Sequence, residues 1–222
     1  MLQLYHLATA VQMPTIRCVN SGVQQPGYLA PYRAAVRKHG GGFRSLLWDS
    51  LKSQAARFDV MARLCRFHKK SILDVGCGRA DLLDFLLGKG IKPEHYTGLE
   101  AVDELADAAE QKKRANSLII RTDFIAEPAR LFTAADIIVF SGSLNMLESN
   151  VFYATLRTAH NAAVKEVAFN FLSSPYLAGA DYLHWHRPSV VQKFAEELGG
   201  QVKMREDYLE GDCTVRIRKI KH

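Results

Sequence analysis

Short apolar runs alternate with stretches of helical periodicity along most of the chain. In "SILDVGCGRADLLDFLL", residues 71–87, an apolar run at Ile72, Leu73 and Val75 is followed by leucines at helical spacing. The pattern predicts strands at 71–75, 95–100, 117–121, 135–140 and 165–172, with helices near 79–89, 102–115, 150–162 and 188–199. Strands that alternate with helices in this way favour a parallel sheet covered by helices on both faces.

Two more strands are predicted at the end of the chain, at 201–208 and 212–220, around the turn Glu210-Gly211-Asp212. A tight turn makes them antiparallel neighbours, so the last strand reverses direction within an otherwise parallel sheet. The predicted fold class is therefore α/β, with a doubly wound seven-stranded sheet that is mostly parallel and has an antiparallel terminal hairpin strand.

The beginning of the chain has a different pattern. Prolines and the triplet Gly40-Gly41-Gly42 interrupt residues 1–42, which we expect to be an extension with one short helix near 30–38. Residues 43–67 contain neither glycine nor proline, and their apolar residues recur at roughly helical spacing, which indicates one long or two short amphipathic helices. We expect 43–69 to form a helical lid on a main domain at 70–222.

Composition narrows the class of protein. A hydrophobic share of 48% with 23% charged residues is typical of a globular domain, and no apolar run approaches the length of a membrane-spanning helix. The cysteines form no C-x-x-C pair, which argues against a structural zinc site and a disulfide scaffold and favours the reducing cytoplasm; they are Cys18, Cys65, Cys77 and Cys213.

The net charge of +6 is concentrated at the beginning of the chain. Residues 1–48 contain no acidic residue and carry +5, from Arg17, Arg33, Arg37, Lys38 and Arg44. A basic segment without acidic residues suits contact with nucleic acid, a membrane surface or an anionic substrate. The same composition is typical of an organelle-targeting presequence. A solvated extension explains it equally well, and the sequence leaves these alternatives open.

The glycine turn at 76–78 indicates a ligand without phosphate. A dinucleotide-binding turn reads G-x-G-x-x-G, but the third glycine position here is Asp81, with Asp84 one helical turn later. Two carboxylates at the start of a helix would repel a pyrophosphate. This excludes NAD and favours a zwitterionic nucleoside.

Together with three strand-end segments, the turn resembles the class I S-adenosylmethionine-dependent methyltransferases, which have a Rossmann-like fold. The matching segments are "LDVGCGRADL" at 73–82, "YTGLE" at 96–100, "IIRTDF" at 119–124 and "ADIIVFSGSLN" at 135–145. "SGSLN", "FNFLSS" and "DYLEGDCTV" are also similar to a little-characterised bacterial branch of that family. The resemblance covers residues 70–220 and implies S-adenosylmethionine as cofactor and S-adenosylhomocysteine (SAH) as product.

The resemblance also implies a set of cofactor contacts. Asp74 would hold the ammonium group, Glu100 the ribose hydroxyls and Asp123 the adenine amino group. The full set of implied contacts is Asp74, Gly76, Cys77, Gly78, Glu100, Ala101, Asp123, Phe124, Ser141 and Gly142. Many relatives have a glycine where this chain has Ala80 and an apolar residue where it has Arg79, which we expect to point outward or to pair with Asp81 or Asp84. We expect Cys77 to be a small buried residue and not a nucleophile.

The sequence says less about the methyl acceptor than about the cofactor. Ligands of such sheets gather at the carboxyl ends of the strands, so Asn145 is the first candidate for a polar contact, and 173–188 for a cap on the acceptor site. In that cap His184 or His186 would accept a proton, and Tyr182 or Trp185 would stack on the acceptor. The two histidines lack an evident third ligand for a metal, and no metal site is predicted. A loop whose aromatic residues bury its own underside remains an alternative.

The sequence therefore predicts a cytoplasmic methyltransferase with a small-molecule acceptor. The segment after the fourth strand lacks the Asn/Asp-Pro-Pro-Tyr/Phe motif of enzymes that methylate planar amino groups, which lowers the weight of a nucleobase or glutamine acceptor. The basic tail "RIRKIKH" lacks the interleaved aromatic residues that stack on bases. Two alternatives stay open: an enzyme that methylates RNA or protein through the basic N-terminal arm, and a non-catalytic cofactor-binding module.

Overall fold

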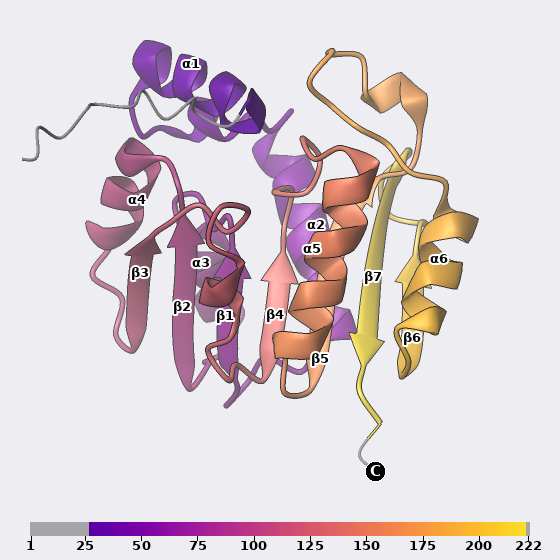
Figure 1. Ribbon diagram of the computed structural model, residues 1–222. Helices are drawn as coiled ribbons and strands as arrows, with labels where there is room; N and C mark the ends of the chain where they lie inside the picture. The colour runs from indigo at the N-terminus through magenta and orange to yellow at the C-terminus, as the bar shows by residue number, and fades with distance from the viewer. Residues whose placement is uncertain (1–26, 221–222) are drawn as a thin grey trace, which may run out of the picture.

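A seven-stranded sheet in the order β3-β2-β1-β4-β5-β7-β6 runs through the protein (Figure 1). The computed structural model describes residues 27–220, and the predictions for residues 1–26, including Cys18, lie outside this range. Strands β1 to β5 are parallel, and β7 is antiparallel to both β5 and β6, as the sequence predicted. The strands are β1 (Ser71–Val75), β2 (His95–Glu100), β3 (Ser117–Arg121), β4 (Ile137–Phe140), β5 (Glu166–Leu172), β6 (Gln201–Arg205) and β7 (Asp212–Arg218).

Helices follow the strands as predicted. They are α3 (Asp81–Gly88), α4 (Asp103–Glu110), α5 (Ser149–Ala162) and α6 (Pro188–Glu197), and short 3₁₀ turns lie at Pro128–Leu131 and Pro175–Leu177. All of these α-helices except α5 are shorter than predicted. Helix α4 ends five residues before the predicted end because Lys113 and Asn116 have left-handed backbone, with φ of 47° and 56°. A helix does not continue through such residues.

Alternating side chains of the strands build two cores, one on each face of the sheet. Leu73 and Ile138 point into the cluster that contains Phe152 of α5 and Val191 of α6. Their neighbours Ile72 and Ile137 belong to the other cluster, which α2, α3 and α4 complete through residues such as Met61, Leu86 and Ala109. Since successive strand residues point to opposite faces, a continuous apolar run buries both faces of a parallel sheet.

The N-terminal part forms three helical pieces, η1 (Gly27–Leu29) with α1 (Ala30–His39), η2 (Phe43–Leu46) and α2 (Leu51–Leu64). The region 43–67 therefore takes the second of the two predicted forms, two separate helices. Leu47 ends η2 in a left-handed conformation, and Ser50 starts α2 with a capping box, in which its Oγ accepts from the Ser53 N–H at 3.1 Å. Helix α1 lies across the edge where the parallel strands end (Figure 1).

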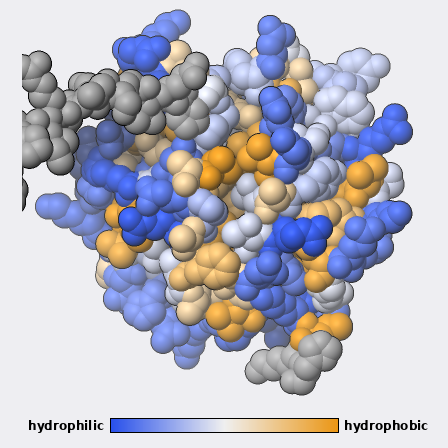
Figure 2. Space-filling view, viewed as in Figure 1, coloured by the Kyte–Doolittle hydropathy of each residue, from blue (hydrophilic) through white to orange (hydrophobic). Residues whose placement is uncertain are grey.

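Among residues 27–220, no helix is both long and apolar enough to cross a membrane. On the face drawn in Figure 2, hydrophobic residues occur in groups that hydrophilic ones separate.

Candidate functional site

A cavity of about 730 Å³ lies at the carboxyl ends of the central strands. Its walls come from several parts of the chain. They are the turn after β1 with the end of β2, Leu105 and Phe124, the segment 141–146 after β4, the N-terminal pieces between Tyr28 and Phe58, and residues of the segments 172–183 and 209–212. This volume is in the range of small-molecule sites, about 300–1,000 Å³, and the place is where ligands bind in open α/β sheets.

The glycine turn lines one end of the cavity and has no room for side chains. Gly76 and Gly78 have φ of 69° and 55°. A Cβ on Gly76 would lie 2.5 Å from the Ser143 Cβ, and one on Gly78 would lie 2.6 Å from the Leu46 Cδ2. Ala80, where many relatives have glycine, is also left-handed at 54°. The turn thus exposes bare backbone to the cavity.

Glu100 closes the turn from the end of β2. Its Oε2 accepts from the Gly78 N–H at 2.7 Å, and its Oε1 accepts from the Ala101 and Val102 N–H groups at 2.9 Å. Burial raises the pKa of the Glu100 carboxyl, and these three backbone donors act in the opposite direction. The carboxylate is fixed in place by the backbone while it lines the cavity.

Asp74 lies beside Glu100, at the end of β1. The Tyr96 hydroxyl donates to its Oδ2 at 2.6 Å, and the side chain is buried. Burial raises the pKa of Asp74 to about 7, with repulsion from Glu100 and Asp81 adding to the effect. This end of the cavity therefore offers several carboxyl groups to a cation.

Lys112 and Arg79 compensate part of that charge from outside the cavity. The Lys112 ammonium lies 2.6 Å from carboxylate oxygens of both Asp81 and Asp84, and the Arg79 Nε lies 3.9 Å from Asp81. Neither basic residue is part of the cavity lining. Arg79 thus pairs with Asp81, one of the two arrangements expected for it from the sequence.

Beyond Glu100, aromatic residues line the end of the cavity near β3. Phe124 and Tyr28 contribute to the walls, with ring centroids 6.3 Å apart. The Tyr28 hydroxyl donates to Asp123, which also accepts from the Ile125 N–H at 2.8 Å, and Asp123 itself lies behind the lining. No local pattern marks Tyr28 as part of the site, because it precedes the main domain by more than forty residues.

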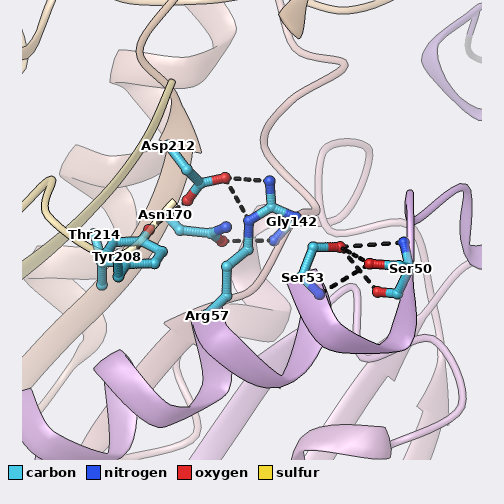
Figure 3. A network of polar contacts seen from close by, with 8 residues as sticks. All are labelled: Ser50, Ser53, Arg57, Gly142, Asn170, Tyr208, Asp212 and Thr214. Atoms are coloured by element: carbon cyan, nitrogen blue, oxygen red, sulfur yellow. Dashed lines mark hydrogen bonds and ion pairs between the residues drawn. The ribbon is translucent and has the colours of Figure 1, made fainter. Parts of the chain in front are cut away.

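Ser141, Gly142 and Asn145 line the wall that follows β4. The Gly142 N–H donates to the Asn170 Oδ1 at 2.7 Å (Figure 3), which fixes the turn to β5. The Ser141 Oγ and the Asn145 Oδ1 are buried and have no hydrogen-bond partner among residues 27–220. Buried polar atoms without a partner are costly, so these two are candidates to hold a ligand.

Neither His184 nor His186, the residues predicted to accept a proton, is part of the cavity lining. The His184 N–H donates to the carbonyl of Asn145 at 2.7 Å, whereas His186 is turned away from the cavity. The His186 N–H donates to the Leu172 carbonyl at 2.9 Å, and its ring stacks on Phe152 with centroids 4.0 Å apart. Burial lowers the pKa of His186 to about 4. The short bridge between Leu172 and Trp185 turns His186 into the core, which its spacing in the sequence could not show.

Other residues of the 173–188 segment do reach the cavity. Leu177, Tyr182 and Leu183 line it, whereas Tyr176 is 93% exposed. The part of this segment that lines the cavity thus presents leucine and tyrosine side chains, and not imidazoles. Within the described part of the chain, no group of three His, Cys, Asp or Glu side chains is arranged to hold a metal ion.

Cys77 is buried, as the sequence indicated. Its Sγ would lie 2.5 Å from a Cβ added to Gly98 on β2, so the small thiol and the glycine fit together. Burial raises the pKa of the Cys77 thiol well above its ordinary value, which leaves it without thiolate character near neutral pH.

The opposite end of the cavity contains an ion pair that sequence reasoning missed. The Arg57 guanidinium on α2 contacts Asp212, the first residue of β7 (Figure 3). It also lies over the Trp48 ring, 4.6 Å from the centroid. The Tyr208 hydroxyl completes the group by donating to Asp212. No local pattern marks this pair, because its members are 155 positions apart.

Comparison with known proteins identifies the family. No family model matches the chain. The curated protein "Putative methyltransferase Rv1506c" of Mycobacterium tuberculosis (strain ATCC 25618 / H37Rv) is 31% identical over an alignment of 161 residues, and the match covers 67% of this chain and 93% of that protein.

Solved structures share the fold at lower identity. The DhpI-SAM-HEP complex matches with a TM-score of 0.67 and 14% identity, over 86% of this chain and 95% of that one. Magnesium protoporphyrin IX methyltransferase (ChlM) from Synechocystis PCC 6803 with bound SAH matches with a TM-score of 0.62 and 13% identity, over 80% and 93%. The methyltransferase domain of bacterial CtHen1-C matches with a TM-score of 0.59 and 17% identity, over 76% and 98%. The curated relative aligns over nearly its whole length and the sheet has the same topology class, so this chain belongs to the class I methyltransferases of Rossmann-like fold.

Proposed function

We propose that the protein uses S-adenosylmethionine to methylate a small-molecule acceptor. The observation that carries the proposal is one cavity that joins the glycine turn and Glu100 to the wall after β4, under cover of α1, α2 and the 173–188 segment. A small acceptor could be enclosed there next to the cofactor. Similar structures were solved with this cofactor or its product bound.

The residues of the glycine end fit the cofactor. The backbone of Gly76 and Gly78 lines the cavity at positions where a Cβ would collide with Ser143 or Leu46, and the buried carboxylates of Asp74 and Glu100 suit a ligand with an ammonium and a sulfonium group. We assign Asp74 to the ammonium group and Glu100 to the ribose hydroxyls, which would share its oxygens with the Gly78 N–H. Phe124 would contact the adenine, with Asp123 holding Tyr28 beside it, and Ser141 and Gly142 would lie near the sulfonium.

The bound cofactor supplies a methyl group on a sulfonium centre, which is already a good leaving group. The chain itself is assigned orientation and exclusion of water, since the walls around the acceptor are largely apolar and no histidine among residues 27–220 lines them. Asn145 remains the first candidate for a polar contact to the acceptor because its Oδ1 is buried and unpaired. Acceptors that are nucleophilic without a base suit this cavity best.

Calorimetric titration with SAH tests the proposal. We expect wild-type protein to bind SAH and Glu100→Gln to bind it at least tenfold more weakly, because charge-assisted hydrogen bonds contribute about 1.5–3 kcal/mol. Glu104→Gln, an exposed glutamate on α4, is the matched control and should bind like the wild type. Equal affinities in all three proteins, or binding of NAD in place of SAH, would contradict the cofactor assignment.

A polymer acceptor is the second candidate, and the acid-free segment at 1–48 favours it. Arg37 and Lys38 are exposed in the last turn of α1. If they dock RNA, the double variant Arg37→Gln/Lys38→Gln should bind a single-stranded RNA oligonucleotide more weakly, and the salt dependence of binding should become less steep. Fluorescence anisotropy at two salt concentrations measures both. SAH binding without turnover of small molecules or polymers would instead favour a non-catalytic module.

A further inference from the structure

Arg57 is positioned on the acceptor side of the cavity. Its guanidinium is bound to Asp212 on β7, and β7 is the third strand from β1 in the sheet order. With neighbouring strands about 4.8 Å apart, β7 lies roughly 14 Å from the strand that leads into the glycine turn. The cofactor carboxylates at Asp74 and Glu100 and the cation at Arg57 thus occupy opposite ends of the same cavity.

The contacts of the Arg57 guanidinium fix its position and leave N–H donors for a ligand. Its Nε and Nη2 both contact the Asp212 Oδ2, and the Trp48 ring covers one face. Its Nη1 makes no hydrogen bond within the described chain, and the side chain is 11% exposed and lines the cavity. Arginine has five N–H donors in a planar fork that matches a carboxylate. A second oxyanion can therefore bind on the side away from Asp212.

Asp212 acts as the positioning group. It is buried, and the Tyr208 hydroxyl that donates to it lies 2.7 Å from the Thr214 Oγ1. These contacts fix the carboxylate, and it in turn fixes Arg57 (Figure 3). Asp49 and Glu210 also line the cavity, but both are exposed, so water and salt screen their charges.

The cavity that Arg57 lines has largely apolar walls. They include the side chains of Leu47, Met146, Leu172, Leu177, Leu183 and Leu209. Walls of this kind select an apolar body, and a fixed arginine selects the orientation of one anionic group. We infer that the acceptor is an organic acid with an apolar body, whose carboxylate binds Arg57 away from the atom that receives the methyl group. The inference rests on the proposed function and specifies its substrate class.

Two other roles of Arg57 lead to different measurements. If the pair only ties α2 to β7, changes at Arg57 will alter stability and leave ligand binding intact. If Arg57 binds the carboxylate of the cofactor, the same changes will weaken SAH. Arg57→Lys separates these roles, because lysine keeps the charge beside Asp212 and loses the planar fork.

The test uses SAH-loaded protein with phenylacetate and phenylacetamide as probes. In ¹H–¹⁵N spectra of the arginine side chains, we expect phenylacetate to shift the Nε–Hε resonance of Arg57 and phenylacetamide to leave it unchanged. In Arg57→Lys the Kd for phenylacetate should rise at least tenfold, while the Kd for SAH stays within twofold. Arg63→Lys is the matched control, since Arg63 lies on the same helix, 71% exposed, and pairs with Asp59.

A double variant protects the test against misfolding. Arg57→Met/Asp212→Asn removes both charges together, so neither is left buried alone, and it should fold, bind SAH and fail to bind phenylacetate. Equal binding of acid and amide, absence of any phenylacetate binding, or a tenfold loss of SAH affinity in Arg57→Lys would each overturn the inference. If wild-type protein does not bind SAH, the proposed function fails instead, and the Arg57 resonance still reports on the carboxylate.

Discussion

Replacing Asp74 by asparagine should make the cofactor-free protein more stable at alkaline pH while it impairs cofactor binding. Asp74 is buried, and burial raises its pKa to about 7 from the ordinary 3.8. Asparagine has nearly the same shape, carries no charge and can still accept from the Tyr96 hydroxyl. The substitution therefore removes the cost of an ionised carboxylate and keeps the packing.

The sign of the pH dependence follows from the direction of the shift. Because the folded state holds the proton more tightly than the unfolded state, the wild type is favoured at low pH and loses that advantage as the pH rises through about 7. From pH 5 to pH 7 the change is two pH units at about 1.4 kcal/mol each, or about 3 kcal/mol in the free energy of unfolding. Asp74→Asn has no such loss, so its stability relative to wild type should increase by about this amount.

Urea denaturation of both proteins at pH 5 and pH 8, without ligand, measures the effect. Calorimetry gives the functional counterpart. If Asp74 binds the ammonium group as a carboxylate, wild-type protein should bind SAH about tenfold more tightly at pH 8 than at pH 6, since the ionised fraction rises about tenfold around a pKa of about 7. Asp74→Asn should bind weakly at both values.

Asp59→Asn is the control for the pH series. The hydrogen bond from Lys89 lowers the pKa of Asp59, so its contribution to stability is complete above the ordinary pKa and should be equal at pH 5 and pH 8. A stability difference between Asp74→Asn and wild type that does not change between these pH values would refute the reasoning.

Three further predictions concern Tyr28 at the aromatic end of the cavity, the buried His186, and the thiols of the buried cysteines. Tyr28→Ala should weaken SAH about tenfold in calorimetry, since stacking of a base on an aromatic ring contributes about 1–3 kcal/mol, whereas Tyr28→Phe should change it less than threefold. His186→Phe should keep the stack on Phe152 and remove the unpaired Nε2, so methyl transfer to any identified acceptor should be unchanged and urea denaturation should show equal or slightly higher stability. In a Cys18→Ser protein, Ellman's reagent should label no thiol until the chain unfolds, because the thiols of Cys65, Cys77 and Cys213 are buried; rapid labelling of the folded protein would disprove their protection.

The local pattern of apolar residues, glycines and turns was sufficient to predict the strands of the sheet and the order of strands and helices along the chain. Apolar runs that bury both faces, glycines with positive φ and the turn before β7 are all properties of neighbouring residues. The break between η2 and α2 was harder to predict, because the capping box at Ser50 uses serine at both of its positions. Its second position is more often glutamate or glutamine.

The residues of the candidate site fall into two groups: those that the local sequence marks, and those that only the tertiary structure brings together. Asp74 and Glu100 lie at the ends of strands, in segments that carry the resemblance to the methyltransferase family, and that resemblance implied their roles. Arg57 and Asp212 meet only after the chain has folded, and His186 faces the core because a short bridge to Leu172 sets its orientation. Such contacts depend on tertiary structure, which hydrophobic periodicity does not encode.

A crystal structure of the protein grown with SAH tests the central claim most directly. The account predicts SAH in the 730 Å³ cavity, with its methionine part over Gly76–Gly78 and its ribose hydroxyls on Glu100, while Arg57 stays on Asp212. SAH bound elsewhere, or side chains of the protein filling the space above the glycine turn at saturating SAH, would contradict it.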